Sequence, residues 1–494
     1  MITNILSLPN EVIEIICNEL KGSRKCLRLL CTRFNEVLQP ILFFHVTIDF
    51  QRPSTLRDLA ANSELPMLIQ HLDVKGILDR DTNMSDLFLS VVVPQLVNVR
   101  KVIGTFHEIS SEYFLDCLAN MQRLEDVTLE VIGHGGCIPN IKLSRLRPLQ
   151  RISLSKIWER QSTLVLQDDI SFLISLSPDL QCLELDSGIH HSEGMAPSFN
   201  DILDRINEEK LLQITRLRLQ CFGVQWNKSI TTRLFSLTSL TLLDIYPYAP
   251  VKNPMDEAEV LSPLHMNEAL WKTLQLEGII LRELVTDEIC EVFLDYIASY
   301  SGLIKLVLTR ATAHNGDAVA ADTLAETFYF QVLPLHADSL EILDIRGAYE
   351  RKWCYGYHYS DSLRQCRRLN RTCLSIYPQD INQRVGEDAI WSLLEVAEKL
   401  PLLEHLYILQ ACPEEERGVL NYNWWNHRSS LVSDAIERSI RYAPKFTPPC
   451  PGFAVITQTH RFLASTYSLS KGMRRPWFQG FFASHFRFPA LLHH

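Results

Sequence analysis

A short hydrophobic pattern recurs along most of the chain: apolar, two variable residues, apolar, one variable residue, apolar. Clear copies begin at Leu124, Leu149, Leu180, Ile214, Leu240, Trp271, Leu303, Leu340 and Leu403, and weaker copies begin near Ile69, Val99 and Leu369. Each copy alternates like a half-buried strand. The copies begin roughly 30 residues apart, slightly more than the usual leucine-rich repeat.

Helical patterns lie between these copies. Examples are 113–121, 199–212, 288–300, 324–332 and 389–400. Strand followed by helix, repeated many times, predicts a curved α/β solenoid with a parallel sheet on its inner face. The alternative is a doubly wound α/β domain, which usually carries a Gly-rich phosphate loop. The sequence has no G-x-G-x-x-G and no Walker motif, and this favours the solenoid.

The first fifty residues predict a separate helical hairpin. One apolar helical face consists of Val12, Ile13, Ile16, Cys17 and Leu20, and a second consists of Leu27, Leu30, Phe34, Val37 and Leu38. Pro40 follows the second face, and residues 43–48 read as an extended exit. So short a hairpin buries little surface by itself. It therefore needs the following domain, a partner protein, or both to pack against.

These residues resemble an F-box. The resemblance covers roughly residues 6–48 and rests on Leu8-Pro9, Glu11-Val12-Ile13, Ile16, Leu20, Leu27, Cys31, Phe34, Leu38 and the exit 40–46. It implies docking on a Skp-type adaptor, which links F-box proteins to a cullin-based ubiquitin ligase. The implied adaptor-facing residues are Leu8, Pro9, Ile13, Ile16, Leu20, Leu27 and Leu30. The alternative is an ordinary helical cap, which solenoids need at their ends.

The expected fold class is therefore α/β, in four segments. Residues 1–48 form the small helical F-box-like module, 49–68 a connecting segment, 69–437 the irregular leucine-rich-repeat-like solenoid, and 438–494 a tail. The tail contains no Asp or Glu, carries eight Lys or Arg, and is rich in Phe and Pro. We expect it to be poorly ordered. It is either a basic-aromatic contact segment or a stretch never selected for folding.

The residues between the apolar positions of each strand should line the inner face of the solenoid. Flanking the last apolar position, acidic residues outnumber basic ones and predict a mildly acidic face for a basic or polar protein segment. The candidate target-binding residues are Glu184, Asp186, Arg218, Asp244, Asp344 and Arg346. Simple solvation of a polar face is the alternative for any one of them.

An aromatic-rich segment, 346–359, follows the strand at 340–345. We expect Trp353 and Tyr357 to be anchors for a protein target, since exposed Trp and Tyr often anchor interfaces. The alternative is that these aromatic side chains pack over the edge of the solenoid.

Composition narrows the function further. The chain has 494 residues and a net charge of -10, which argues against nucleic-acid binding. There is no signal-peptide pattern and no apolar stretch long enough to span a bilayer. The 13 cysteines include no C-x-x-C pair, which favours a reducing compartment, cytoplasm or nucleus. Motifs for catalysis are missing, and Cys354 with His358 is too little for a metal site.

We therefore expect a chain that is not an enzyme and that needs no cofactor or metal. By the resemblance, it is the substrate-recognition subunit of a cullin-type ubiquitin ligase, binding the adaptor through the hairpin and a protein target through the repeats. The alternative is a leucine-rich-repeat scaffold with no ubiquitin role.

Overall fold

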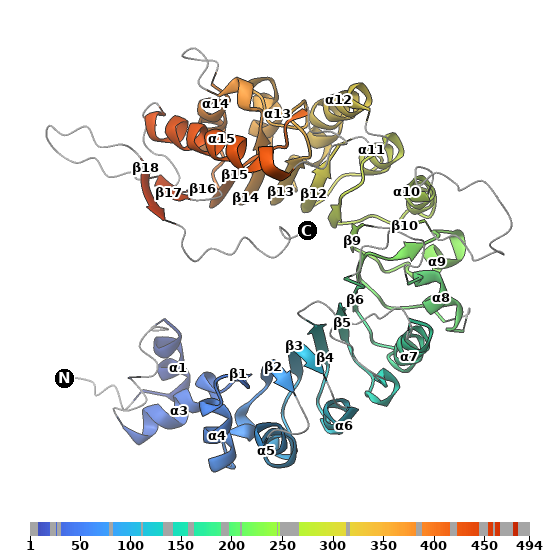
Figure 1. Ribbon diagram of the computed structural model, residues 1–494, viewed down its shortest axis with the longest axis vertical. Coiled ribbons are helices and arrows are strands. Elements are labelled where there is room, and N and C mark those ends of the chain that lie inside the picture. The colour runs from blue at the N-terminus through green and yellow to red at the C-terminus, as the bar shows by residue number, and fades with distance from the viewer. Residues whose placement is uncertain are drawn as a thin grey trace, which may run out of the picture. The chain divides into compact units, whose positions relative to one another are not determined.

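The computed structural model describes residues 8–19, 26, 31–78, 83–109, 112–131, 142–156, 163–188, 197–207, 210–244, 246–247, 266–312, 317–381, 388–414, 422–443, 453–457, 460–464 and 478–482. The chain divides into two compact units. The first unit contains Met1–Gln225, Thr232–Ser236 and Ile245–Lys252, and the second contains Trp226–Thr231, Leu237–Asp244 and Asn253–His494. Each unit is a mostly parallel sheet with helices, as the α/β prediction requires (Figure 1).

The first unit pairs its strands in chain order, all parallel. They are β1 (His45–Asp49), β2 (His71–Leu78), β3 (Lys101–Ile109), β4 (Asp126–Val131), β5 (Arg151–Ser155), β6 (Cys182–Asp186) and β7 (Arg216–Gln220). The helices are α1 (Asn10–Glu19), α3 (Thr32–Leu42), α4 (Ser54–Ala61), α5 (Asn83–Leu87), α6 (Glu112–Asn120), α7 (Thr163–Leu176) and α8 (Phe199–Asp204). β8 (Gly223–Val224) and β10 (Tyr246–Pro247) form a separate parallel pair.

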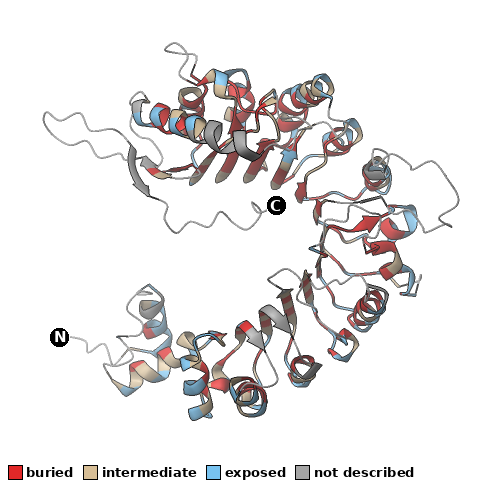
Figure 2. Cartoon of the chain, in the orientation of Figure 1, coloured by how far each residue is buried: buried red, intermediate tan, exposed pale blue. Residues whose placement is uncertain are grey.

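Alternation along each strand sorts the side chains between the two faces of this sheet. In β5, Ile152 and Leu154 are buried, whereas Arg151, Ser153 and Ser155 are only partly covered. The same alternation in neighbouring strands stacks the apolar residues in register, with Leu154 beside Leu185 of β6. The helices cover this apolar face and leave the polar face to the other side (Figures 1 and 2). The motif therefore predicted both the strands and their buried positions.

The sheet begins earlier than the sequence analysis expected. The exit from the hairpin is β1, and it pairs with β2 from His45↔His71 to Asp49↔Lys75. The segment 49–68 contains α4 and a 3₁₀ turn, η3 (Pro66–Leu68), with Leu56 and Leu59 buried. It is a helical part of the first repeat. The spacing of its apolar residues is that of a short amphipathic helix, and this helix was not among the predicted elements.

In the second unit, the parallel strands are β9 (Ser239–Leu243), β11 (Glu283–Thr286), β12 (Lys305–Ala311), β13 (Ile342–Gly347), β14 (Arg371–Ile376), β15 (His405–Gln410) and β16 (Ala454–Ile456). The helices are α10 (Met266–Leu276), α11 (Glu291–Ala298), α12 (Ala318–Thr327), α13 (Ser360–Gln365), α14 (Ala389–Glu398) and α15 (Tyr422–Tyr442). A π-helical turn, η8 (Phe328–Val332), continues α12. The residues of α9 (Lys228–Arg233) are divided between the two units.

One repeat was placed on the wrong element. The copy that begins at Trp271 lies in α10, and the strand of this repeat is β11, which begins twelve residues later at Glu283. Apolar residues at 271, 274 and 276 fit a helical face as well as a strand, because three positions cannot distinguish the two periods. Trp271 is buried against Phe293 of α11, with 4.9 Å between ring centroids.

The boundary at 437 is also wrong. α15 continues to Tyr442, β16 adds a parallel strand to β15, and β17 (His460–Ala464) and β18 (Phe478–Phe482) add antiparallel strands. Glu437 of α15 has its Oε1 atom 2.5 Å from Nδ1 of His460, and both side chains are largely buried. The described part of the segment 438–494 therefore extends the sheet. Its basic composition concealed the strand pattern.

Candidate functional site

The N-terminal hairpin has a small core of its own. Ile13 of α1 packs against Phe34 and Leu38 of α3, and all three are buried. Partly buried apolar side chains surround them: Leu8, Cys31, Val37, Ile41 and Leu42. Arg33 joins the two helices, because its Nη2 donates to the carbonyl oxygen of Leu8 (2.6 Å) and to Oδ1 of Asn10 (3.1 Å). The described part of the hairpin is thus held together from within.

The outer face of α1 exposes two large apolar side chains, next to the exposed acidic residues Glu11 and Glu19. Ile15 is 62% exposed and Val12 is 37% exposed, although both are large hydrophobic residues. They are three positions apart, so they are neighbours on the helix surface. The exposed Pro9 and the partly exposed Ile16 lie on the same helix or directly before it. An apolar helix face in water is typical of an interaction surface.

The structure divides the predicted adaptor-facing residues into three groups. Pro9, Ile16 and Leu8 retain exposed surface. Ile13 is fully buried in the hairpin core, so its prediction as a contact residue is corrected to a supporting one. Leu20, Leu27 and Leu30 lie outside the described residues. Ile15 was not among the predicted contact residues, because the apolar positions of α1 surround much of the helix and do not single out one face.

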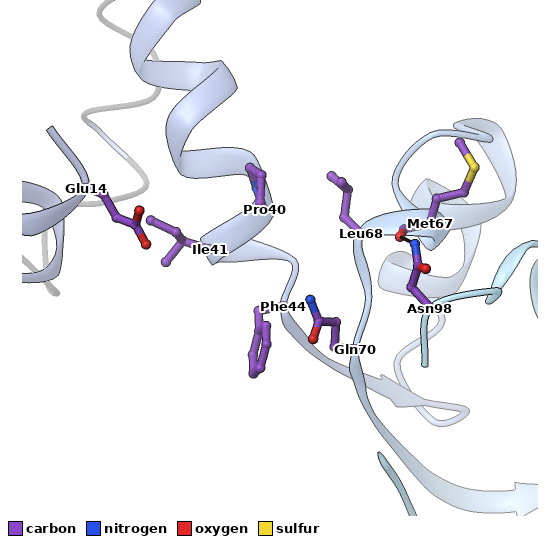
Figure 3. A pocket seen from close by; sticks show the side chains of 8 residues that line it. All are labelled: Glu14, Pro40, Ile41, Phe44, Met67, Leu68, Gln70 and Asn98. Atoms are coloured by element: carbon purple, nitrogen blue, oxygen red, sulfur yellow. Dashed lines mark hydrogen bonds between the residues drawn. The ribbon is translucent and has the colours of Figure 1, made fainter. Parts of the chain in front are cut away.

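A groove lies between the hairpin and the first repeats (Figure 3). Its volume is about 540 Å³, and it is lined by Glu14, Pro40, Ile41, Phe44, Met67, Leu68, Gln70 and Asn98. Phe44 and Met67 are 38% and 44% exposed. Phe44 is held by His71, whose ring centroid is 4.4 Å away. The groove therefore places a second apolar surface beside the hairpin.

Three predicted target-binding residues meet on the polar sheet face of the first unit. Glu184 lies beside Arg218 in the register of β6 and β7, and Asp186 is two residues along β6. Glu184 accepts hydrogen bonds from Arg151 Nη2 (2.7 Å) and Ser153 Oγ (3.1 Å). Asp186 accepts from Ser155 Oγ (2.7 Å). Most of their hydrogen-bonding capacity is therefore used within the sheet.

The polar face of the first unit is closer to charge balance than the mildly acidic face that the sequence predicts. Acidic and basic side chains are nearly balanced on this face, which carries Asp49, Asp73, Asp126, Glu130, Glu184 and Asp186 with Lys75, Lys101, Arg151, Arg216 and Arg218. Ion pairs join neighbouring strands, such as Lys101 Nζ to Asp126 Oδ2 at 2.9 Å. The prediction left out the residue before the second apolar position of each motif, which faces the same side and is often basic.

Asp344 and Arg346 of the second unit form a buried pair. Arg346 donates from Nε and Nη2 to the two carboxylate oxygens of Asp344, at 2.9 and 2.8 Å. They are 3% and 9% exposed. An apolar cluster of Leu243, Val285 and Val307 lies close by on the strands β9, β11 and β12. This pair neutralises itself, so it stabilises the sheet and offers little free charge to a target.

The aromatic segment 346–359 was predicted either to expose anchors for a target or to pack over the edge of the solenoid, and it does both. Trp353 is 2% exposed and packs on Phe328, with 5.6 Å between ring centroids, so the prediction of an exposed anchor is wrong for it. Tyr359 is also buried and stacks on Tyr329 at 3.8 Å. Tyr357 is 59% exposed, as the prediction of an exposed aromatic side chain requires. Packing over the solenoid edge therefore accounts for most of this segment.

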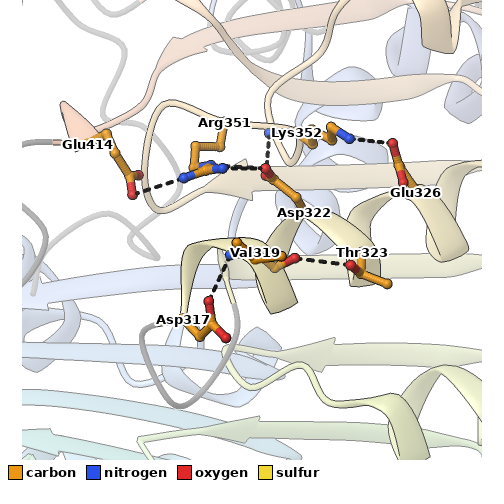
Figure 4. Close-up of polar contacts among 8 residues, drawn as sticks. All are labelled: Asp317, Val319, Asp322, Thr323, Glu326, Arg351, Lys352 and Glu414. Atoms are coloured by element: carbon orange, nitrogen blue, oxygen red, sulfur yellow. Dashed lines mark hydrogen bonds and ion pairs between the residues drawn. The ribbon is translucent and has the colours of Figure 1, made fainter.

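Ion pairs fix the same segment to α12 (Figure 4). Arg351 donates to Asp322 Oδ2 from Nη2 (2.7 Å) and lies 3.7 Å from Glu414. Lys352 pairs with Glu326. The loop is thus held directly before Trp353, which explains why it does not project freely.

Asp244 lies beside Asp287, and Asp287 and Glu288 both have raised pKa values. The backbone N–H of Asp244 donates to Asp287 Oδ2 at 2.8 Å, and the backbone φ of Asp244 is +48°. Burial raises the pKa of Asp287 to about 6. Burial, with the nearby charges of Asp287 and Glu268, raises the pKa of Glu288 to about 8. The second unit therefore holds protons here that an unfolded chain releases.

This arrangement predicts a loss of stability with rising pH. The folded chain binds the Glu288 proton up to about pH 8, whereas the reference value is 4.5. Between these values the native state binds more protons, so the free energy of unfolding falls as pH rises. Glu288→Gln should remove the Glu288 part of this dependence, between about pH 6 and pH 8, and raise stability above pH 8 by about 1–3 kcal/mol. Urea unfolding across this pH range measures it, and an unchanged slope would contradict the prediction.

Comparison with known proteins adds no relative: no family model matches the chain, and no curated protein matches it. No helix in the described segments is both long and apolar enough to cross a membrane. Within the same segments, no group of three or more His, Cys, Asp or Glu side chains is arranged to hold a metal ion.

Proposed function

We propose that the chain is the substrate-recognition subunit of a cullin-type ubiquitin ligase. The hairpin would bind a Skp-type adaptor, and the repeats would hold a protein target. The observation that carries the proposal is the open apolar face of α1 on a hairpin with its own core. The F-box-like pattern of the same residues supports it.

The hairpin suits docking because its contact face and its core are made of different residues. Ile13, Phe34 and Leu38 hold the two helices together. Val12 and Ile15 are left for a partner. Burying one such side chain in an interface stabilises a complex by roughly 1.5–3 kcal/mol. The groove at Phe44 and Met67 would accept a further apolar group of the adaptor.

In this role the chain performs no covalent step. It positions a target, and its partners transfer ubiquitin. The proposal assigns the chain to the cytoplasm or the nucleus, where such ligases act, and requires no cofactor.

A scaffold without a ubiquitin role is the second candidate, with the hairpin as a cap. The pairing of β1 with β2 favours it, because this strand continues the hairpin directly into the sheet. The groove argues against it, since a cap that only seals the array would leave no open space between hairpin and repeats.

Titration of the full chain with purified Skp-type adaptor tests the proposal. We expect a stoichiometric complex with a dissociation constant near or below micromolar, because two apolar anchors and a groove contribute. A chain that is folded by circular dichroism and binds no adaptor would refute the ligase role and leave the scaffold.

A further inference from the structure

Basic and aromatic side chains gather on the polar sheet face of the second unit. Arg371 begins β14 and lies beside His405, the first residue of β15. Tyr407 is two residues along β15, and Ile456 of β16 connects it in register to Arg461 of β17. Lys305 of β12 continues the row on the other side, through Ile342. We name these five residues, Lys305, Arg371, His405, Tyr407 and Arg461, the cationic patch.

The patch is built around a stacked guanidinium. The Cζ atom of Arg371 lies 4.9 Å from the centroid of the Tyr407 ring. The His405 ring lies 6.3 Å from that ring and nearly parallel to it, at 26°. Stacking fixes the plane of the guanidinium and so orients its N–H groups for a two-point contact. The Nε atom of Arg371 has no hydrogen-bond partner, although the atom itself is enclosed.

Two cations of the patch, Lys305 and Arg371, differ in their pairing from the cations of the first unit. In the first unit, Lys101 and Arg151 pair with carboxylates on the next strand at 2.9 and 2.7 Å. Among the residues that the structure describes, Lys305 and Arg371 have no carboxylate within ion-pair distance. Glu283 of β11 lies beside Lys305 in register, and its Oε2 atom accepts a hydrogen bond from Ser239 Oγ at 3.1 Å. Asp344, in the neighbouring row, pairs with Arg346.

Two other acids near the patch do not cancel its charge. The side chain of Glu404 is 74% exposed, and its Oε2 atom lies 4.0 Å from Nδ1 of His405, at the outer limit of an ion pair. Glu341 pairs with Arg368 at 3.1 Å. Burial, together with the charges of Arg461 and then Arg371, lowers the pKa of His405, which is consistent with a positive local potential.

We propose that the cationic patch binds an extended Asp/Glu-rich segment of a partner protein. A carboxylate would meet the terminal N–H groups of Arg371, and flanking carboxylates would meet Lys305 and Arg461. From β12 to β17 the sheet spans roughly 24 Å, given about 4.8 Å between strands. An extended segment of about seven residues covers this length.

Acidic protein is the favoured partner class because the patch is small and the chain is acidic elsewhere. A net charge of -10 would repel a long polyanion such as a nucleic acid, which usually needs an extended basic surface. A short acidic segment can contact the patch alone. The inference rests on the proposed function. It adds the chemistry of the segment that a target would present to the repeats.

Fluorescence polarisation with the full chain tests the inference. The probe is a labelled Glu-rich peptide, and the matched control peptide has Gln in place of every Glu. We expect the Glu peptide to bind, to weaken as salt is added, and to bind about ten-fold or more weaker to a Lys305→Gln, Arg371→Gln double variant. Lys272→Gln, which removes an exposed charge from α10, should bind as the parent does.

Equal binding of the two peptides would overturn the inference, and so would unchanged affinity in a folded double variant. Tighter binding of a phosphorylated peptide or of single-stranded nucleic acid would also overturn it, by assigning the patch to another partner class. The assay contains no adaptor, so it can fail while adaptor binding succeeds, and the two proposals can be judged separately.

Discussion

Replacing Arg346 with leucine should lower the free energy of unfolding of the second unit by about 3–5 kcal/mol. Arg346 donates two hydrogen bonds to Asp344, and both side chains are almost fully enclosed. The variant leaves the carboxylate of Asp344 buried without this charge partner, and such a group costs much more than an exposed one. Chemical denaturation followed by tryptophan fluorescence measures the loss.

Two further variants separate the charge effect from lost packing. Asp344→Leu with Arg346→Leu removes both charges and should recover most of the stability, because Val307 and Cys373 flank Asp344 in the sheet. Arg310→Leu removes an exposed arginine 3.9 Å from Asp244 and should cost less than about 1 kcal/mol. If Arg346→Leu lowers the free energy of unfolding no more than Arg310→Leu does, the Asp344–Arg346 pair does not stabilise the sheet.

A Val12→Asp, Ile15→Asp double variant should lose at least about a hundred-fold in adaptor affinity. Both side chains are on the open face of α1, so the substitution places charge where the complex would exclude water. Neither residue belongs to the buried group of the hairpin core, so the variant should remain folded. Calorimetric titration with the adaptor gives the change.

The matched control is Leu276→Asp. Leu276 is 84% exposed at the end of α10, far along the chain from the hairpin, and its substitution should leave adaptor affinity unchanged. Ile15→Asp alone changes only the more exposed of the two positions. It tests whether affinity is lost without unfolding of the hairpin. Full affinity in both hairpin variants would place the contact elsewhere.

The repeat pattern predicted the sheet because burial on one face imposes a period of two. Strands such as β5 and β6 have their apolar residues where the pattern placed them, in parallel register. The prediction failed where the pattern was ambiguous. Trp271 begins a motif that satisfies a helix as well as a strand, and only packing on Phe293 decides between them.

The candidate sites were less predictable because they depend on partners distant in sequence. No local signal shows that Trp353 finds a pocket beside Phe328 or that Arg346 closes on Asp344. Nor does sequence reveal that Arg151 neutralises Glu184 on the next strand. A charge count along one position of the repeat missed these pairs, since neutralisation occurs between strands.

Hydrogen exchange on the full chain, alone and with the Skp-type adaptor, tests the central claim most directly. The claim is that α1 offers its outer face to another protein. We predict slower amide exchange at Asn10–Glu19 and around Phe44 in the complex, with β14 and β15 unchanged. Protection confined to the sheet strands, with α1 exchanging as in the free chain, would contradict it.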